Sequence, residues 1–177
     1  MVHDISQQGY SAKEVYKLLG VNKNQLFHWI NTHRLLRPDI DEGGGRGKKR
    51  VLSRNNLLEL ALIKQLLQYK IDLKLIKKIK ARIDEWERFA INKNGKWIEA
   101  DIPRQKGSKK FDLYEWAFEG GEEARFMLAL EERSYRLGLI EDTPYVSKKV
   151  PLILPPTYIV IDVKKMAGLV MEQIKKA

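Results

Sequence analysis

Residues 11–30 read SAKEVYKLLGVNKNQLFHWI, and this stretch contains the beginnings of two helices separated by a glycine. Ser11 and Glu14 have the spacing of a capping box, in which the serine accepts a backbone N–H and the glutamate reaches back to the cap. Gly20 supplies the left-handed position that ends a short helix, and Asn22 caps the next helix. Two helices joined by a tight glycine turn predict a helix-turn-helix.

The second of these helices has an apolar face and a polar face. At about 100° per residue, Leu26, Trp29 and Ile30 fall together and are predicted to be core. The polar face consists of amides and an imidazole, which can hydrogen-bond base edges in the major groove. The predicted base-contacting residues are Asn24, His28, Asn31 and Gln25. A merely solvated polar face is the alternative, and the position within a helix-turn-helix favours the DNA interpretation.

A glycine-rich basic segment follows in RPDIDEGGGRGKKRVLS, residues 37–53. Pro38 disfavours helical geometry in the residue before it and so ends the second helix. The chain from Leu36 to Leu52 is then predicted to be a hairpin with a mobile cationic tip, which is a wing. Glycines let such a tip approach a phosphate backbone closely, and the cations displace condensed counterions. A surface loop with incidental charge is the alternative.

Two further helices follow the predicted wing. Ser53 caps a helix in which leucines and isoleucines occupy an arc too wide for a surface helix, so this helix is predicted to be buried and central. Asp72 caps a fourth helix. The apolar stripe of the fourth helix is Ile76, Ile79, Ile83 and Trp86.

Positive charge is concentrated in the first half of the chain. The 177 residues carry a net charge of +10, and residues 1–80 hold 16 lysines and arginines against 7 acidic residues, whereas residues 81–177 hold 17 against 16. This asymmetry predicts a basic module that binds a polyanion, with nucleic acid as the leading partner and an acidic membrane surface as the rival. Because no apolar run approaches the length of a membrane span, we expect a cytoplasmic, nucleoid-associated protein.

Three segments of the first half carry a family resemblance. They are YSAKEVYKLLGVNKNQLFHWINTHRLLRP, RVLSRNNLLELALIKQLL and KIDLKLI. Their order and motifs resemble the MerR family of bacterial transcription regulators over about residues 10–79. The first matches a Tyr-Ser start, a Gly-Val turn and a Leu-Leu-x-Pro end. The second matches the exit of a wing into a helix, and the third matches a short turn before a helix.

The resemblance implies a winged helix-turn-helix that contacts DNA through the second helix, the wing and the start of the first helix, with dimers formed through a later helix. Asn24 and His28 take positions where the family usually has arginine and tyrosine, and Arg50 keeps the wing arginine. Phe27 replaces a frequent DNA-contacting arginine, and Arg34 replaces the usual glycine. Leu52 replaces a common wing tyrosine. The phosphate contacts predicted on this basis are Ser11, Lys23, Arg46, Lys48, Lys49 and Arg50.

The second half is predicted to be α+β. Asn94-Gly95 between short apolar stretches predicts a hairpin, followed by a basic loop at 103–110. A helix is expected near 122–137, ending at Gly138. A strand is expected over Tyr158–Ile161, and Asp162 caps a terminal helix. The aromatic residues Trp97, Tyr114, Trp116 and Phe118 are read either as a small-molecule pocket or, more often in proteins, as core.

The predicted fold is therefore mainly α with small β elements, with a winged helix-turn-helix DNA-binding domain at 1–80 and an α+β regulatory or dimerisation domain at 81–177. The predicted function is sequence-specific binding of double-stranded DNA as a homodimeric transcription regulator. The alternative is a winged-helix accessory, either an antitoxin-like adaptor with a protein partner or a recombination factor. The sequence leaves open whether the second half binds a small-molecule effector or a protein.

An enzyme is the competing class. The chain has no cysteine, which excludes disulfides, thiolate metal sites and cysteine catalysis. His28 and His33 are five residues apart, a spacing that does not stack them for a metal on one helix turn. No phosphate loop or nucleophile elbow appears, so no catalytic residue, metal site or cofactor is predicted.

Overall fold

The computed structural model describes residues 9–42, 49–100, 106–120, 125–130, 135–140 and 158–176. The helices are α1 (Ala12–Leu19), α2 (Lys23–Phe27), the π-helical turn η2 (His28–Thr32), α3 (Arg54–Gln68), α4 (Leu73–Asp84), α5 (Leu113–Glu119) and α6 (Val163–Lys176). The strands are β1 (Tyr10–Ser11), β2 (Val51–Leu52), β3 (Glu87–Lys93), β4 (Lys96–Glu99), β5 (Lys109–Asp112), β6 (Arg125–Leu130), β7 (Tyr135–Ile140) and β8 (Tyr158–Asp162).

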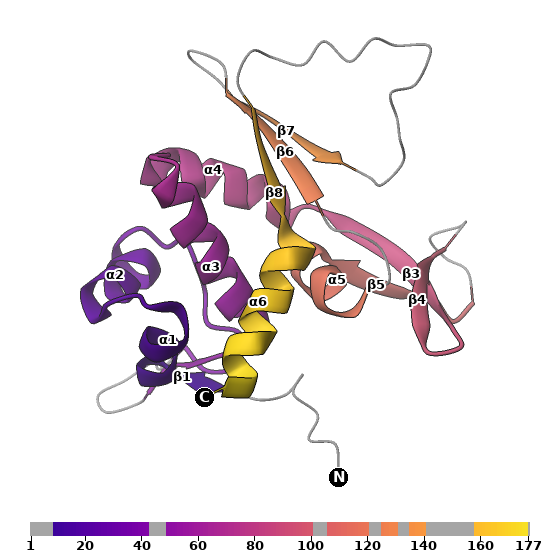
Figure 1. Cartoon of the computed structure of the whole chain (residues 1–177), viewed down its shortest axis with the longest axis horizontal. Helices are drawn as coiled ribbons and strands as arrows, with labels where there is room; N and C mark the ends of the chain where they lie inside the picture. Colours follow the sequence, from indigo (N-terminus) through magenta and orange to yellow (C-terminus); the bar gives the residue numbers. More distant parts are fainter. Residues whose placement is uncertain are drawn as a thin grey trace. The chain divides into compact units, whose positions relative to one another are not determined.

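The fold is mainly α with small β elements, as the sequence predicted (Figure 1). The chain forms two compact units. Unit 1 comprises Met1–Ala81 with Gly168–Ala177, and unit 2 comprises Arg82–Ala167. Within the part of the chain that the structure describes, no helix is long and apolar enough to cross a membrane.

The helix-turn-helix begins with two capping boxes. The backbone N–H of Ser11 donates to Glu14 Oε2 at 2.7 Å, and the Glu14 N–H returns a bond to Ser11 Oγ at 3.4 Å. Gly20 ends α1 in the left-handed conformation, with φ of 59°. The side chain of Asn22 then caps α2. The local signals in the sequence therefore fix both helix starts and the turn between them.

The second helix ends earlier than the sequence predicted. After five α-helical residues it continues as the π-helical turn η2, which ends at Thr32 and not beside Pro38. Arg34 takes a left-handed φ of 50°, and the Leu35 N–H bonds back to Trp29 O at 2.8 Å. A left-handed residue with such a back-bond terminates a helix, so Arg34 ends it before the proline can.

The glycine-rich basic segment over residues 37–50 is called the wing segment below. The strand that follows it, β2, pairs mainly with β1. β2 runs antiparallel to β1, with Tyr10 opposite Leu52. Of the predicted hairpin between Leu36 and Leu52, the described residues 36–42 and 49–52 form one bridge, in which the backbones of Asp41 and Val51 exchange hydrogen bonds of 3.1 and 3.0 Å. The sequence did not indicate β1, because a two-residue strand leaves no periodicity.

Helices α3 and α4 provide the core of unit 1. As predicted, Ser53 caps α3, and the helix buries Leu57, Leu60 and Ile63 among others. Asp72 Oδ1 accepts from the Leu75 N–H at 2.9 Å and caps α4. The buried stripe of α4 is Ile76, Ile79 and Ile83. Trp86 lies outside this stripe, because the helix ends at Asp84.

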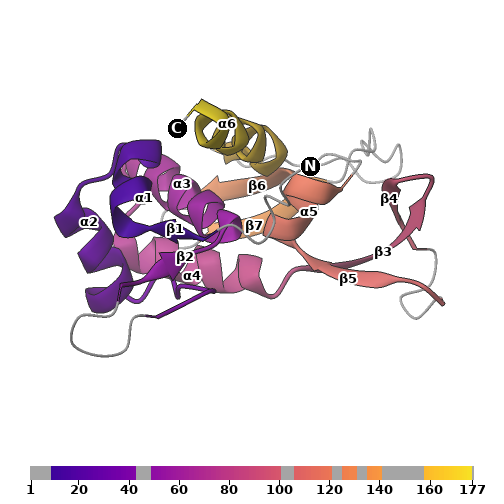
Figure 2. The same cartoon turned by 90° about the horizontal axis from the view of Figure 1, so that it is seen from below.

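Unit 2 contains two three-stranded antiparallel sheets, with strand orders β4-β3-β5 and β7-β6-β8. Strands β3 and β4 form a hairpin (Figure 2). The predicted turn at Asn94-Gly95 joins them, and both residues have the positive φ of a type I′ turn, 53° and 82°. In the first sheet and α5, the rings of Trp97, Phe111 and Trp116 pack edge-to-face with centroids 4.9 and 5.5 Å apart. Phe111 and Trp116 are fully buried, which is the core interpretation of these aromatic residues.

The helix predicted near 122–137 is wrong. Arg125–Leu130 and Tyr135–Ile140 are strands β6 and β7, and Gly138 lies within β7 opposite Met127 instead of ending a helix. Leucine, methionine, alanine and arginine favour helix locally, but β6 is the central strand of its sheet and pairs with β7 and β8. Pairing with β8, more than 25 residues later in the chain, overrides the local preference.

The end of the chain follows the prediction. β8 covers the expected strand, and Asp162 Oδ1 accepts from the Lys165 N–H at 2.8 Å as the cap of α6. Val163, Ala167 and Val170 form the buried stripe of this helix.

Substitutions of Gly95 and Gly168 test the backbone conformations assigned to the β3–β4 turn and to α6. A Cβ added to Gly95 or to Gly168 meets no atom within 4 Å, so only the backbone differs between them. Gly95→Ala should lower the free energy of unfolding by about 1–2 kcal/mol, because its φ of 82° is left-handed. Gly168→Ala, within α6, should raise it by about 0.5–1 kcal/mol. Urea unfolding measures both, and the same sign for the two variants would contradict the turn or the helix.

Candidate nucleic-acid interface

The exposed side of α2 and the start of η2 carry three of the four predicted base-contacting residues. Asn24, Gln25 and His28 are exposed, while Leu26 and Trp29 are buried. The apolar side chains anchor the helix to unit 1 and leave a polar surface outward. This division is the one that the helical period predicted.

Two of these polar residues already have partners in the protein. Gln25 Oε1 accepts from the backbone N–H of Asn22 at 3.0 Å, so one end of its amide belongs to the capping box. Nδ1 of His28 lies 3.2 Å from Thr32 Oγ1. The Thr32 contact orients the imidazole and leaves Nε2 as the nitrogen that can reach a base. Within the part of the chain that the structure describes, no hydrogen bond restrains the side chain of Asn24.

Asn31 behaves differently from the other predicted base contacts. Its Nδ2 donates to Phe27 O at 3.1 Å, and its Oδ1 accepts from Arg50 Nη2. The π-helical turn also rotates fewer degrees per residue than an α-helix, so Asn31 does not lie where a 3.6-residue period places it. The Oδ1 end of its amide therefore joins η2 to the wing segment, while the Nδ2 end bonds back to α2.

Arg50 fixes the end of the wing segment next to β2 through hydrogen bonds within the protein. Besides its bond to Asn31, its Nε donates to Glu42 O at 3.2 Å, and the adjacent Val51 bridges Asp41. A guanidinium has more N–H donors than these bonds use, so donors remain for a phosphate. Lys49 beside it is exposed. The predicted contacts Arg46 and Lys48 lie outside the described residues.

A hollow of about 410 Å³ brings several of the predicted residues together. Lys23, Asn24 and Arg50 lie on it, from two segments that are distant in sequence. Its other lining residues are Ala12, Tyr16, Leu26, Phe27, Ile30 and Leu52. Gln25, His28, Asn31 and Lys49 do not line it. The hollow combines an apolar floor with two cations and an amide.

Ser11 has a structural role at the edge of this region. Its Oγ donates to Glu14 Oε2 at 2.7 Å and accepts the Glu14 N–H. The hydrogen bonds from the Ser11 side chain and backbone lower the pKa of the Glu14 carboxyl. The predicted phosphate contact by Ser11 therefore concerns a hydroxyl that already caps α1.

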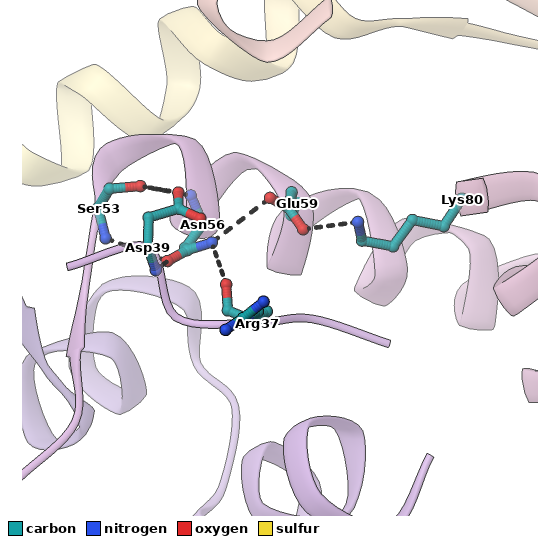
Figure 3. A network of polar contacts seen from close by, with 6 residues as sticks. All are labelled: Arg37, Asp39, Ser53, Asn56, Glu59 and Lys80. Atoms are coloured by element: carbon teal, nitrogen blue, oxygen red, sulfur yellow. Dashed lines mark hydrogen bonds and ion pairs between the residues drawn. The ribbon is translucent and has the colours of Figure 1, made fainter. Parts of the chain in front are cut away.

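A buried polar network underlies the wing segment (Figure 3). Asn56 in α3 is fully buried. Its Nδ2 donates to Arg37 O at 3.1 Å, and its Oδ1 accepts from the backbone N–H groups of Asp39 and Ser53 at 2.8 and 3.3 Å. Ser53 Oγ also donates to Asp39 Oδ2 at 2.6 Å. One amide thus fixes the backbone that leads from η2 toward the wing.

The same network extends to α4 through an ion pair. Asn56 Nδ2 lies 3.4 Å from Glu59 Oε1, and Glu59 Oε2 lies 2.9 Å from Lys80 Nζ (Figure 3). The two charged side chains are only 10% and 13% exposed. Two charges this far from water need each other, because either alone would carry most of its desolvation penalty. The position of α4 is therefore coupled to the wing segment.

Sequence reasoning assigned no role in this region to Tyr16 or Asn56, and it noted Phe27 only as the replacement of a frequent DNA-contacting arginine. Phe27 follows Asn24 by three positions and so lies on the same side of α2, which the helical spacing does indicate. Asn56 lay in a predicted apolar helix, and its long-range partners have no signal in the sequence. Among the described residues, no three His, Asp or Glu side chains come together in an arrangement suited to a metal.

The helix-turn-helix segment is similar to a known protein family. Residues 10–83 match the family model described as MerR HTH family regulatory protein. The match runs from β1 through almost the whole of α4, and the resemblance seen in the sequence is thereby confirmed for this segment. A match to this family indicates a DNA-binding regulator of transcription in general terms. No curated protein matches the chain.

Substitutions of the adjacent residues Asn55 and Asn56 test the polar network drawn in Figure 3. Asn56→Ala removes partners from two N–H groups and one carbonyl, and should lower the free energy of unfolding by about 3 kcal/mol or more. Asn55→Ala is the matched control, because its buried Oδ1 has no hydrogen-bond partner in the described structure and its loss should change stability by less than about 0.5 kcal/mol. Similar losses in urea unfolding would contradict the assigned role of Asn56.

Proposed function

We propose that this protein is a sequence-specific regulator of transcription whose MerR-type helix-turn-helix module binds double-stranded DNA. In this proposal α2 and η2 enter the major groove, and the basic wing segment lies on the phosphate backbone. The observation that carries the proposal is the convergence of Lys23, Asn24 and Arg50 on one hollow beside the exposed face of α2. The family match and the excess of positive charge in residues 1–80 support it.

Base reading is assigned to Asn24 and His28. Asn24 is exposed beside two cations, and an asparagine amide can bond adenine N6 and N7 together. His28 is exposed one turn further on, and its ring is oriented by Thr32. Gln25 can add a bond through the amide nitrogen that its cap leaves available. Asn31 acts chiefly by holding Arg50, since both ends of its amide are already engaged.

Phosphate binding is assigned to the cations around this face. Lys23 and Arg50 line the hollow, and Lys49 extends into solvent beside them. Arg46 and Lys48 stay predicted phosphate contacts, as does the Ser11 hydroxyl. Neutralising several phosphates releases condensed counterions, so the affinity of such a site falls steeply with salt. These contacts fix orientation on DNA and carry no sequence information.

The two kinds of contact respond differently to substitution. Lys49→Ala with Arg50→Ala should weaken binding to specific and random duplexes alike and flatten the salt slope, whereas Asn24→Ala should lose about 1–3 kcal/mol of discrimination at one base pair. Lys93→Ala with Lys96→Ala removes the same charge from the β3–β4 hairpin and serves as the control. Fluorescence anisotropy over a salt series measures all of them.

Two results would count against this proposal. Affinity that does not change with salt would contradict phosphate binding and favour an adaptor that acts through a protein partner. Equal effects of Asn24→Ala on specific and random DNA would contradict the assignment of the reading residue. The wing variant must also keep its fold, since Arg50 bonds Asn31 and Glu42 within the protein.

The protein is further proposed to act as a homodimer, with unit 2 serving dimerisation or regulation. One helix-turn-helix supplies few base contacts, and paired half-sites multiply them. Sedimentation of the full chain with a selected duplex should give two chains per duplex and an inverted repeat in the bound sequence. One chain per duplex, on a site without two-fold symmetry, would exclude the dimer.

A further inference from the structure

Phe27 is an exposed aromatic residue in the middle of the proposed DNA-binding surface. Its side chain is 54% exposed although it ends α2 and lies next to buried Leu26. Single apolar residues on a protein surface are common and need no explanation by themselves. The surroundings of Phe27 are what distinguish it, because it lines the same hollow as Lys23, Asn24 and Arg50.

The ring of Phe27 is held in place by its neighbours on α2 and η2. The imidazole of His28 meets it edge-to-face with centroids 5.9 Å apart. The carbonyl of Phe27 accepts from Asn31 Nδ2, which fixes the backbone at the start of η2. Lys23 and Asn24 precede it by four and three positions and so flank it along the helix. The aromatic ring thus contacts His28 and lines the same hollow as Asn24, the two residues assigned to base reading.

Duplex DNA offers few apolar groups to such a ring. In the major groove the edges of the base pairs are hydrogen-bond donors and acceptors, apart from the C5-methyl group of thymine. A phenyl ring makes favourable apolar contact with this methyl group, and gains nothing from the polar edges. Burial of the ring against a methyl removes apolar surface of both from water.

Resting on the proposed function, we infer that Phe27 is a specificity-determining residue that recognises the C5-methyl group of thymine. Asn24, one turn before it, is suited to adenine in the same or a neighbouring base pair. Together the two residues select an A·T-containing step in each half-site. Lys23 and Arg50 hold the phosphates on either side of the hollow and bring the ring to the groove.

Replacing thymine by deoxyuridine in the DNA tests the contact between Phe27 and the C5-methyl group, because it removes only this methyl group. The full chain first selects bound sequences from a randomised duplex library, and each thymine of the selected site is then replaced by deoxyuridine, which lacks only the methyl group. At one or two thymines per half-site, binding should weaken about fourfold, the equivalent of one buried methyl group at about 0.8 kcal/mol. The other thymines should tolerate the replacement.

Variants of Phe27 connect this effect to the ring. Phe27→Ala should bind the thymine duplex more weakly and should no longer distinguish thymine from deoxyuridine at those positions, whereas Phe27→Leu should keep part of the distinction. Tyr69→Ala removes another exposed aromatic ring, 48% exposed at the end of α3, and should change neither affinity nor the deoxyuridine effect. Circular dichroism checks that each variant is folded.

The outcomes separate this inference from the proposed function. Specific binding in which no thymine methyl matters, or in which the methyl effect persists in Phe27→Ala, overturns the role of Phe27 and leaves the DNA-binding proposal intact. If Phe27→Ala weakens binding to thymine and deoxyuridine duplexes equally, the ring contacts the sugar-phosphate backbone instead. This result also overturns the inference that Phe27 recognises the thymine methyl group. No preference for any sequence overturns both proposals.

Discussion

The burial of Asn56 is the constraint on which the proposed DNA-binding surface depends. A fully buried amide must find partners for both its ends, and the partners here are backbone groups of residues 37, 39 and 53. Satisfying them fixes the segment that carries the chain away from η2. That segment reaches Asp41, which bridges Val51, and Arg50 then returns to Asn31. The wing segment and η2 are thus closed into one circuit of polar contacts around α3.

Local chemistry explains how much of the fold could be predicted. The capping boxes at Ser11 and Asn22, the left-handed Gly20 and the Asn94-Gly95 turn each act within a few residues, and all appear where the sequence indicates. The β6–β7 pair was missed because its residues favour helix locally and are held as strands by β8, which is distant in the chain. The early end of the second helix depends on Arg34 adopting a left-handed φ without being glycine. The identity of a residue other than glycine does not indicate that it will adopt this conformation.

The site was predictable in its residue types and less so in its connections. The helical period separated exposed Asn24 and His28 from buried Leu26 correctly. It could not show that Asn31 is engaged by Arg50, because that bond joins residues 19 positions apart and lies beyond a π-helical turn. The hollow likewise requires α1, α2 and β2 to meet. The roles of these residues on DNA are proposals that the structure makes specific enough to measure.

Because the Glu59–Lys80 ion pair joins α3 to α4, the strength of this contact depends on temperature differently from the apolar contacts around it. The hydration of charged groups becomes less favourable as temperature rises, so the penalty for burying this pair falls on warming. The apolar contacts of the same joint, which include Ile76 and Ile79, do not gain in this way. The share of the ion pair in holding α3 and α4 together therefore grows as the temperature rises.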